Sequence, residues 1–248
     1  MENGPLVSII LPAHNERENL KLLIPDIAKI LSKYNHEIII IDDASIDGTK
    51  HAVSDFNVVY IYNHNRQGLA KSIKLGIDTS LGEHIIVMDS DGDHNSVHLP
   101  LMINNLKISD VVLTSRFKKG SKVPGKVRPF LSLGFNLFVR VMTGGKLSDY
   151  LYGHWAANKK ALEKINSTKV FWGYGDYCIR LLFYFEKLGM NIHQIPSISG
   201  ERKFGRGNSK PLKVFFQYTV AVFKLSLKER FKRVRKGDKL SGLPKSNS

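Results

Sequence analysis

Apolar runs alternate with amphipathic stretches along the first hundred residues. Four short runs are apolar almost throughout and rich in β-branched residues, at 7–12, 37–42, 58–62 and 84–88. The stretches between them, at 18–34, 50–55 and 68–79, carry apolar residues at helical spacing. Strands that are apolar on both faces and separated by helices are typical of a parallel sheet covered on both sides. The pattern predicts a Rossmann-like α/β domain with a mostly parallel sheet.

The second half of the chain is less regular. We predict strands at 110–114, at the start of 155–165 and at 191–196, helices at 129–142 and 176–188, and a basic, Gly-rich loop at 202–210. A long helix at 212–235 begins apolar and ends densely basic. We divide the chain into a domain of residues 1–210, an amphipathic basic helix of residues 211–236 and a disordered tail of residues 237–248.

Polar clusters follow three of the four N-terminal strands. These clusters are His14-Asn15-Glu16, Asp42-Asp43 and Asp89-Ser90-Asp91. In parallel α/β sheets, ligands bind beyond the carboxyl ends of the strands. We therefore expect the three clusters to converge on one binding site.

Asp89 and Asp91 occupy alternate positions directly after a buried strand, so both carboxylates can turn toward one cation. Mg²⁺ and Mn²⁺ prefer carboxylate oxygens and accept phosphate oxygens as further ligands. Asp93 extends the cluster. The alternative is a solvated turn, because Asp-Gly and Asp-Ser sequences favour turns. The position after a buried strand, near other acidic strand ends, favours the metal site.

The paired carboxylates of Asp42 and Asp43 need a separate explanation. Asp47 can cap the following helix and Gly48 allows a tight turn, so part of this segment serves local structure. Adjacent like charges cost free energy unless something binds them. We expect the ribose or base of a nucleotide to supply the compensating hydrogen bonds.

The net charge of +15 is unevenly distributed. Residues 210–248 contain eleven Lys and Arg against two acidic residues, a net charge of +9. Nucleic acids, anionic lipids and phosphorylated small molecules all attract such a surface. The one cysteine, Cys178, excludes a disulfide within the chain and a cysteine metal cluster. Residues 1–6 carry no basic-then-apolar targeting signal, and no apolar run reaches the length of about 20 residues that spans a bilayer.

Four ordered motifs resemble family 2 glycosyltransferases, and within that family the dolichyl- or polyprenyl-phosphate mannose synthases. They are the segments 11–16 (LPAHNE), 42–49 (DDASIDGT), 65–69 (NRQGL) and 89–91 (DSD). The resemblance is stronger before Arg116 than after it. It implies a GT-A fold and inversion at the sugar by direct displacement, with a nucleotide-sugar donor, GDP-mannose above all.

The resemblance also assigns roles to individual residues. It implies that the donor is held by Pro12, His14, Glu16, Ile41, Asp43, Asp89, Ser90, Asp91, Arg116, Arg206 and Lys210. It implies Asp89, Asp91 and Asp93 as ligands of Mg²⁺ or Mn²⁺, and Asp89, Asp91, Arg116, Arg202 and Asp176 as catalytic residues. The family usually has tyrosine at the position of His14 and often glutamine at that of Asp93. Either Arg202 or Arg206 is the arginine that faces the phosphates.

The acceptor decides whether a general base is needed. A phosphate acceptor, polyprenyl or dolichyl phosphate, is already anionic near neutral pH, since the second pKa of a phosphomonoester is about 6. A hydroxyl acceptor on a growing glycan is the alternative, and Asp176 is then the candidate base. Outside the enzymes, a basic nucleic-acid-binding protein fits the charge, but its acidic strand ends would repel the phosphate backbone. We expect no nucleic acid partner.

Two apolar helices suggest an anionic membrane surface as a further partner. The stretch 129–142 is apolar apart from Arg140, and 212–227 is followed by the basic run 228–236. An apolar helix with a basic flank is typical of an interfacial segment. The alternative is a pair of core helices with a solvated tail. We expect a peripheral protein on the cytoplasmic face of a membrane.

Overall fold

The computed structural model describes residues 4–125, 127–200, 202–205 and 211–241. In this part of the chain, seven strands form one sheet in the order β3-β2-β1-β4-β6-β5-β7. The strands are β1 (Val7–Ala13), β2 (His36–Asp43), β3 (Val59–Asn63), β4 (His84–Val87), β5 (Val111–Ser115), β6 (Trp155–Asn158) and β7 (Ile192–Pro196). All pairings are parallel except those of β6 with β4 and β5. The predicted mostly parallel sheet is confirmed.

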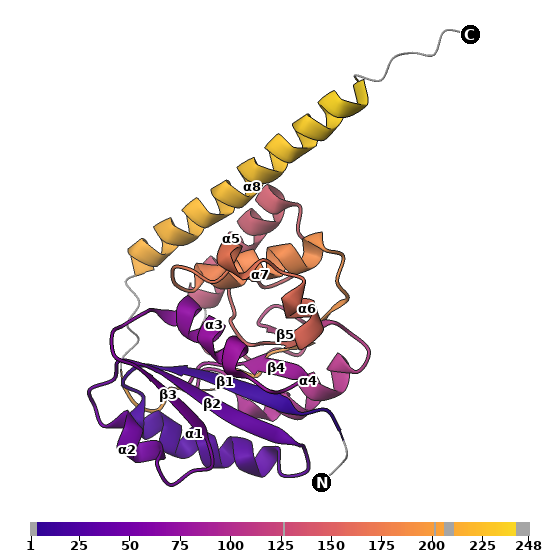
Figure 1. The fold of residues 1–248 in the computed structure, drawn as a ribbon. Coiled ribbons are helices and arrows are strands. Elements are labelled where there is room, and N and C mark those ends of the chain that lie inside the picture. Colours follow the sequence, from indigo (N-terminus) through magenta and orange to yellow (C-terminus); the bar gives the residue numbers. More distant parts are fainter. Residues whose placement is uncertain (1–3, 126, 201, 206–210, 242–248) are drawn as a thin grey trace.

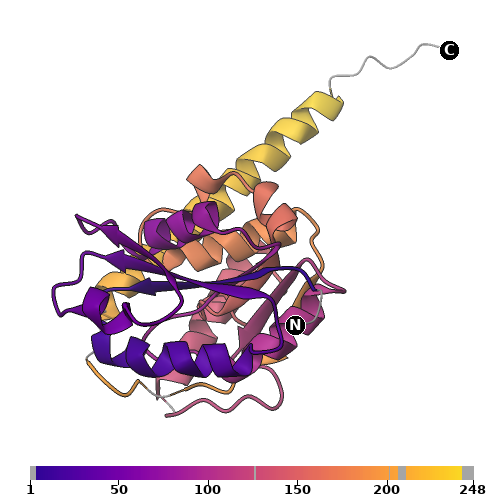
Figure 2. The same cartoon turned by 60° about the horizontal axis from the view of Figure 1, so that its bottom comes forward.

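Helices cover both faces of the sheet (Figures 1 and 2). One face packs against α1 (Arg17–Ile30), α2 (Thr49–Val53) and α4 (Leu99–Leu106). The other packs against α3 (Leu69–Thr79), α5 (Val127–Thr143), α6 (Lys159–Glu163), α7 (Asp176–Lys187) and α8 (Pro211–Ser241). Successive residues of a strand point to opposite faces. Ile10 of β1 therefore joins the α3 side, whereas Ile9 and Leu11 join the α1 side.

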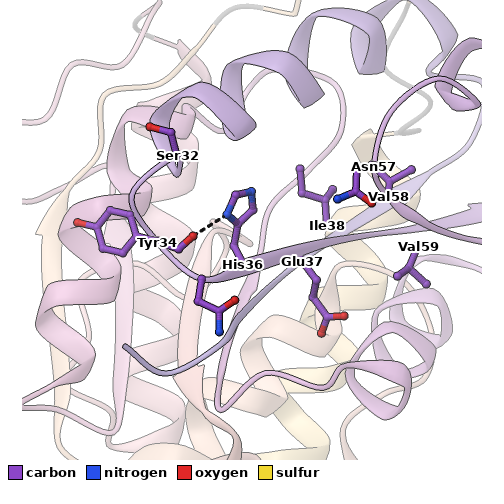
Figure 3. A pocket seen from close by; sticks show the side chains of 9 residues that line it. Ser32, Tyr34, His36, Glu37, Ile38, Asn57, Val58 and Val59 are labelled. Carbon is purple, nitrogen blue, oxygen red and sulfur yellow. Dashed lines mark hydrogen bonds between the residues drawn. The ribbon is translucent and has the colours of Figure 1, made fainter. Parts of the chain in front are cut away.

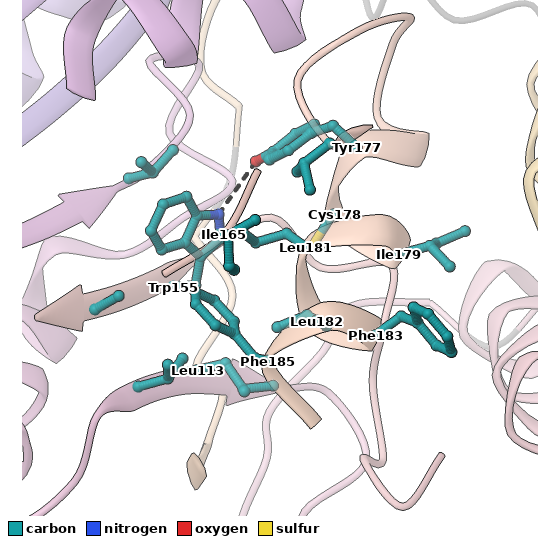
Figure 4. Close-up of a cluster of buried hydrophobic side chains, with 14 of the residues drawn as sticks. Leu113, Trp155, Ile165, Tyr177, Cys178, Ile179, Leu181, Leu182, Phe183 and Phe185 are labelled. Atoms are coloured by element: carbon teal, nitrogen blue, oxygen red, sulfur yellow. Dashed lines mark hydrogen bonds between the residues drawn. The ribbon is translucent and has the colours of Figure 1, made fainter. Parts of the chain in front are cut away.

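The core on the α7 side fixes the loop that precedes α7. Trp155 and Tyr177 are almost completely buried there, as is Phe185, about two helical turns after Tyr177 in α7 (Figure 4). The Trp155 indole N–H donates to the Tyr177 hydroxyl across 3.3 Å. Burying three aromatic side chains of this size stabilises the fold by several kcal/mol, at about 1.5–3 kcal/mol for a large apolar side chain. The contact holds the start of α7 against β6.

The last helix extends beyond the body of the protein (Figure 1). α8 packs against α5 and α7 near its start, where Val222 and Leu225 are buried. It continues to Ser241, five residues beyond the predicted boundary at Lys236. No helix among the described residues combines the length and the apolar character needed to cross a membrane.

Candidate functional site

The carboxyl ends of β2, β1 and β4 are adjacent in the sheet, so the three polar clusters meet as predicted. The Ser90 hydroxyl donates to the Pro12 carbonyl oxygen across 2.8 Å. The Asn15 backbone N–H donates to the Ser45 hydroxyl across 2.8 Å, and the Asn15 side-chain oxygen accepts from the Ile46 N–H across 2.9 Å. Asn15 has a φ of 58°, a left-handed conformation that asparagine tolerates better than most residues. These contacts join the loops after β1, β2 and β4.

The compensation that we expected from a nucleotide at Asp42 comes from the protein itself. Asp42 is 1% exposed, and its carboxylate accepts hydrogen bonds from the Tyr60 hydroxyl and, across 2.8 Å, from the Ser45 N–H. The interpretation of this carboxylate as one that awaits a ligand is wrong. Its hydroxyl donor lies on the next strand, where the charge pattern of the sequence does not reveal it.

Asp43 holds the first turn of α3. Its carboxylate accepts from the backbone N–H groups of Gln67, across 2.7 Å, and Gly68, across 2.8 Å. An acidic group at a helix N-terminus satisfies unpaired N–H groups and complements the helix dipole. The His14 Nδ1 donates to the Asp43 carbonyl oxygen across 2.7 Å. His14 and Asp43, both predicted to bind the nucleotide, thus lie together, and Ile41 is buried two residues earlier.

Asp89 and Asp91 lie at the same edge, with side chains 40% and 24% exposed. The Asp89 N–H donates to Nδ1 of His94 across 2.8 Å, and Asp91 accepts from the Asp93 N–H across 3.0 Å. Among the described residues, no three His, Cys, Asp or Glu side chains gather closely enough to hold a metal ion. Asp93 therefore does not complete a three-carboxylate site. The accessible pair fits Mg²⁺ or Mn²⁺ in the arrangement where one or two carboxylates act with phosphate and water oxygens.

Arg202 lies between two of the predicted donor ligands. Its Nη2 is 2.8 Å from Oε1 of Glu16 and 2.9 Å from Oδ2 of Asp91. Burial raises the pKa of Glu16, as do the negative charges of Asp91 and Asp89, and the guanidinium of Arg202 opposes that rise. Of the basic residues predicted in this loop, Arg206 and Lys210 lie outside the described residues.

Arg116 is part of a buried ion pair. Its Nε and Nη2 are 2.8 and 2.9 Å from the two carboxylate oxygens of Asp149, whose side chain is fully buried. The guanidinium also lies 5.1 Å from the ring centre of Tyr152. Asp149 further accepts from Asn136 of α5 across 3.2 Å. Two of the three guanidinium nitrogens are therefore engaged with the protein, and this geometry does not support the predicted contact of Arg116 with phosphate.

Asp176 is also engaged within the protein. It is 4% exposed, accepts from the Tyr174 N–H across 2.9 Å and forms an ion pair with Arg180 one turn along α7. The Arg180 Nε donates to the Val170 carbonyl oxygen across 2.9 Å. Asp176 is the first residue of α7, and its hydrogen bond from the Tyr174 N–H orders the loop before the helix. A carboxylate held in this way is poorly placed to abstract a proton.

Tyr174, to which sequence reasoning gave no role, lies beside the two aspartates of the site. Its side chain is 39% exposed, and burial and the charges of Asp89 and Asp91 raise its pKa. Arg66 and Arg202 oppose this rise, which places both arginines in the same neighbourhood. The sequence signal was an aromatic residue between two glycines before a helix. Carboxylates, arginines and a tyrosine hydroxyl thus influence one another electrostatically at the carboxyl ends of the strands.

The loop that carries Tyr174 also contacts α8. A β-carbon at Gly175 would lie 2.0 Å from the Tyr218 hydroxyl, so the glycine permits close packing of α8 on the start of α7. The Lys224 ammonium lies 5.9 Å from the ring centre of Trp172.

A cluster of buried histidines packs against residues 89–93, which we call the aspartate loop. The rings of His94 and His154 stack with centroids 4.8 Å apart, and His98 meets His154 edge to face. Burial lowers the pKa of His94 to about 4 and lowers those of His98 and His154. These rings are neutral at physiological pH. His94 consequently accepts from the Asp89 N–H and helps to orient the loop.

A hollow lies at the opposite edge of the sheet from these residues (Figure 3). Its volume is about 330 Å³, and segments 32–38 and 57–59 line it at the amino ends of β2 and β3. None of the predicted site residues contributes to it. The predicted site residues therefore lie away from this hollow, at the carboxyl ends of the strands.

Comparison with known proteins agrees with this geometry. Residues 8–166 match the family described as Glycosyl transferase family 2. The chain is 28% identical over 228 residues to the dolichol-phosphate mannosyltransferase of Pyrococcus furiosus, covering 88% of this chain and 63% of that protein. It is 29% identical over 210 residues to the undecaprenyl-phosphate mannosyltransferase of Micrococcus luteus, covering 80% and 85%. The chain thus spans less than two thirds of the P. furiosus protein and most of the M. luteus protein.

Solved structures share the fold. One is glucosyl-3-phosphoglycerate synthase from Mycobacterium tuberculosis in complex with Mn²⁺, UDP and phosphoglyceric acid. It superposes with a TM-score of 0.71 at 18% identity, covering 98% of this chain and 81% of that one. Another structure of that synthase contains Mg²⁺ and UDP. The predicted GT-A fold is confirmed. With the family match over residues 8–166, the chain belongs to glycosyl transferase family 2.

Proposed function

We propose that this protein transfers mannose from GDP-mannose to a polyprenyl or dolichyl phosphate, with inversion and with a divalent metal. The names of the P. furiosus and M. luteus relatives support the sugar and the lipid phosphate. The observation that carries the proposal is the charged cluster at the carboxyl ends of the strands, where Arg202 lies 2.9 Å from Asp91 and 2.8 Å from Glu16. Such a mixture of charges suits a diphosphate leaving group that arrives with a cation.

Different residues of the chain would bind the nucleoside, the metal and the diphosphate of the donor. His14 and Asp43 stand where the nucleoside would bind, and Asp89 and Asp91 would hold Mg²⁺ or Mn²⁺. A bound divalent metal supplies positive charge to the departing diphosphate. Arginine can clamp phosphate oxygens bidentately, so Arg202 is suited to bind the same leaving group.

The buried state of Asp176 favours a phosphate acceptor over a hydroxyl acceptor. Its carboxylate is occupied by Arg180 and by the Tyr174 N–H. A hydroxyl would need a positioned base, whereas a phosphate monoester is already anionic near neutral pH. The geometry thus supports direct attack by a phosphate oxygen without a proton acceptor on the protein.

The paired helices α5 and α8 support location at an anionic membrane surface. They pack together through Phe135 and Phe215, whose ring centroids are 5.5 Å apart. Both helices expose large apolar side chains: Val127, Phe130, Leu131, Leu133, Leu137, Val141, Leu212, Phe215, Phe216, Phe223 and Leu227. Exposed apolar area of this kind marks an interaction site in a protein. Basic residues follow in the sequence at 228–236. We propose that the protein lies on the cytoplasmic face of such a membrane.

A transfer assay tests the reaction. We expect the protein with Mn²⁺ and GDP-mannose to label polyprenyl phosphate, and we expect Asp91→Ala to lower kcat/KM by about 100-fold or more, in line with the loss of a key electrostatic group. Asp78→Ala, an exposed carboxylate on α3, is the matched control and should retain activity. Turnover that ignores polyprenyl phosphate and responds to a glycan acceptor would contradict the proposed acceptor.

Sedimentation with vesicles tests the membrane surface. Phe130 and Phe216 are 74% and 69% exposed, on α5 and α8 respectively. Replacing both by serine should reduce binding to vesicles that contain anionic lipid. Leu81→Ser, at a residue 76% exposed between α3 and β4, is the control. Equal loss of binding in both variants, or no loss in either, would argue against this face.

A further inference from the structure

An internal cation occupies the carboxylates of the proposed donor site. The Arg202 guanidinium bridges Glu16 and Asp91 at 2.8 and 2.9 Å, and its Nε is 3.2 Å from the same Asp91 oxygen. The three side chains are 24%, 12% and 24% exposed. This pairing is thus more shielded from water than an ordinary surface ion pair.

The backbone on both sides of Arg202 is fixed to the site. On one side, the Gly200 N–H donates to the Asp93 carbonyl oxygen across 2.8 Å. On the other, Phe204 and Asn19 exchange two hydrogen bonds, of 3.3 Å from the Phe204 N–H and 3.2 Å to the Phe204 carbonyl oxygen. These contacts with the aspartate loop and with α1 therefore position Arg202 beside Glu16 and Asp91.

The negative charges explain why a cation is needed there. Glu16, Asp89 and Asp91 lie close enough for the latter two to disfavour ionisation of Glu16. Mg²⁺ coordinates a carboxylate oxygen at about 2.0–2.1 Å. An ion bound to the Asp91 oxygen that Arg202 contacts would lie a few Å from the guanidinium, and the two cations would repel each other. Free metal and Arg202 consequently compete for Asp91.

We propose that Arg202 is the resident counter-ion of this site, which excludes free divalent metal and releases Asp91 when a nucleoside diphosphate arrives with the metal. The diphosphate offers the guanidinium new anionic oxygens, and arginine binds phosphate bidentately. The exchange keeps every charge paired. Metal and donor then bind as one complex. The inference rests on the proposed function only in that the donor carries a diphosphate.

Mn²⁺ binding, measured by electron paramagnetic resonance or calorimetry, tests this competition without any turnover. In the absence of nucleotide, Arg202→Gln should bind Mn²⁺ about five- to tenfold more tightly than the unsubstituted protein, the range expected for removal of one partly shielded ion pair. With GDP present the order should reverse, because the variant lacks a phosphate ligand. Lys203→Gln, which removes the neighbouring exposed charge, should match the unsubstituted protein in both conditions.

Arg202→Lys provides a second variant, which keeps the positive charge and loses the planar guanidinium. Its Mn²⁺ affinity without nucleotide should lie between those of Arg202→Gln and the unsubstituted protein. Thermal melts establish that each variant is folded. Equal Mn²⁺ affinity for Arg202→Gln, Arg202→Lys and the unsubstituted protein without nucleotide overturns the inference. A protein that labels polyprenyl phosphate and yet shows this equality keeps its proposed function. Tighter Mn²⁺ binding in a variant of a protein that transfers no sugar supports the competition and contradicts the proposed function.

Discussion

Two arginines that the family resemblance assigned to phosphate lie in different surroundings. The side chains of Arg116 and Asp149 are 9% and 0% exposed, whereas Arg202 and Asp91 are each 24% exposed. A buried ion pair is costly to break, because one charge is left without a partner away from water. A partly exposed pair can exchange its partners for a ligand. Exposure therefore separates the arginine that supports the fold from the arginine suited to a ligand.

Removing the charge of Asp149 should destabilise the fold strongly. Asp149→Asn leaves the Arg116 guanidinium buried without a counter-charge, and we expect the free energy of unfolding to fall by about 3 kcal/mol or more. Urea denaturation measures this change. Asp78→Asn, at the exposed pair with Lys74, is the same substitution on the surface and should cost less than about 1 kcal/mol. Similar costs at both positions would refute the structural role of Asp149.

At the scale of elements, the start of α7 is a junction between the site and the last helix. Gly175 precedes α7 and admits the Tyr218 hydroxyl of α8, while Tyr174 faces the aspartates. A displacement of α8 therefore acts on the loop that carries Tyr174.

A double-mutant cycle tests this junction. Gly175→Ala forces a β-carbon against Tyr218 and should lower the free energy of unfolding by about 1–3 kcal/mol, the usual cost of overpacking. It should also increase hydrogen exchange in α8. Adding Tyr218→Phe removes the hydroxyl oxygen and should restore most of the loss. Gly134→Ala, on an open face of α5, should be neutral or stabilising by up to about 1 kcal/mol. Additive losses in the double variant would show that the two residues do not meet.

The sequence predicted most elements because their signals are local. β-Branched runs mark β1 to β4, and Pro25 does not interrupt α1. α4 was not predicted, and the antiparallel direction of β6 was not either, since strand direction depends on where the chain re-enters the sheet. The meeting of the acidic residues was predictable for a similar reason. Asp43, Asp89 and Asp91 lie at the carboxyl ends of parallel strands, and these ends meet at one edge of the sheet.

Long-range partners explain what sequence reasoning missed in the site. Asp149 stands 33 residues from Arg116, and no periodicity joins them. The Asp176–Arg180 pair, in contrast, has the i, i+4 spacing of a helical ion pair and was open to prediction. The compensation of Asp43 comes from backbone N–H groups more than twenty residues later, which composition does not reveal.

At the scale of the whole molecule, buried histidines make stability depend on pH. Burial lowers the pKa values of His84, His94, His98 and His154 below the usual value of about 6.5. Below that pH the histidines of the unfolded chain bind protons, whereas the buried histidines of the folded protein stay neutral. The free energy of unfolding should therefore fall as the pH drops from about 6.5 toward 4, the region of the pKa of His94.

His154 offers the sharpest variant for this prediction. Both of its ring nitrogens are buried, and within the described part of the chain they have no hydrogen-bond partner. His154→Phe keeps an aromatic ring in the stack and removes one titrating group, so the loss of stability between pH 7 and pH 5 should shrink. Denaturation at several pH values measures it. His193→Phe, the same substitution at an exposed position of β7, is the surface control.

The contact between Gly200 and the aspartate loop limits how this protein can vary. A β-carbon at Gly200 would lie 2.0 Å from the carbonyl oxygen of Gly92. This oxygen belongs to the main chain, so no substitution at position 92 removes it. Saturation mutagenesis at this position should therefore reject every other amino acid, although glycine has no side chain to bind a substrate. A designer who wishes to change the donor or the metal has to work around this backbone contact, by altering Glu16 or Arg202 instead.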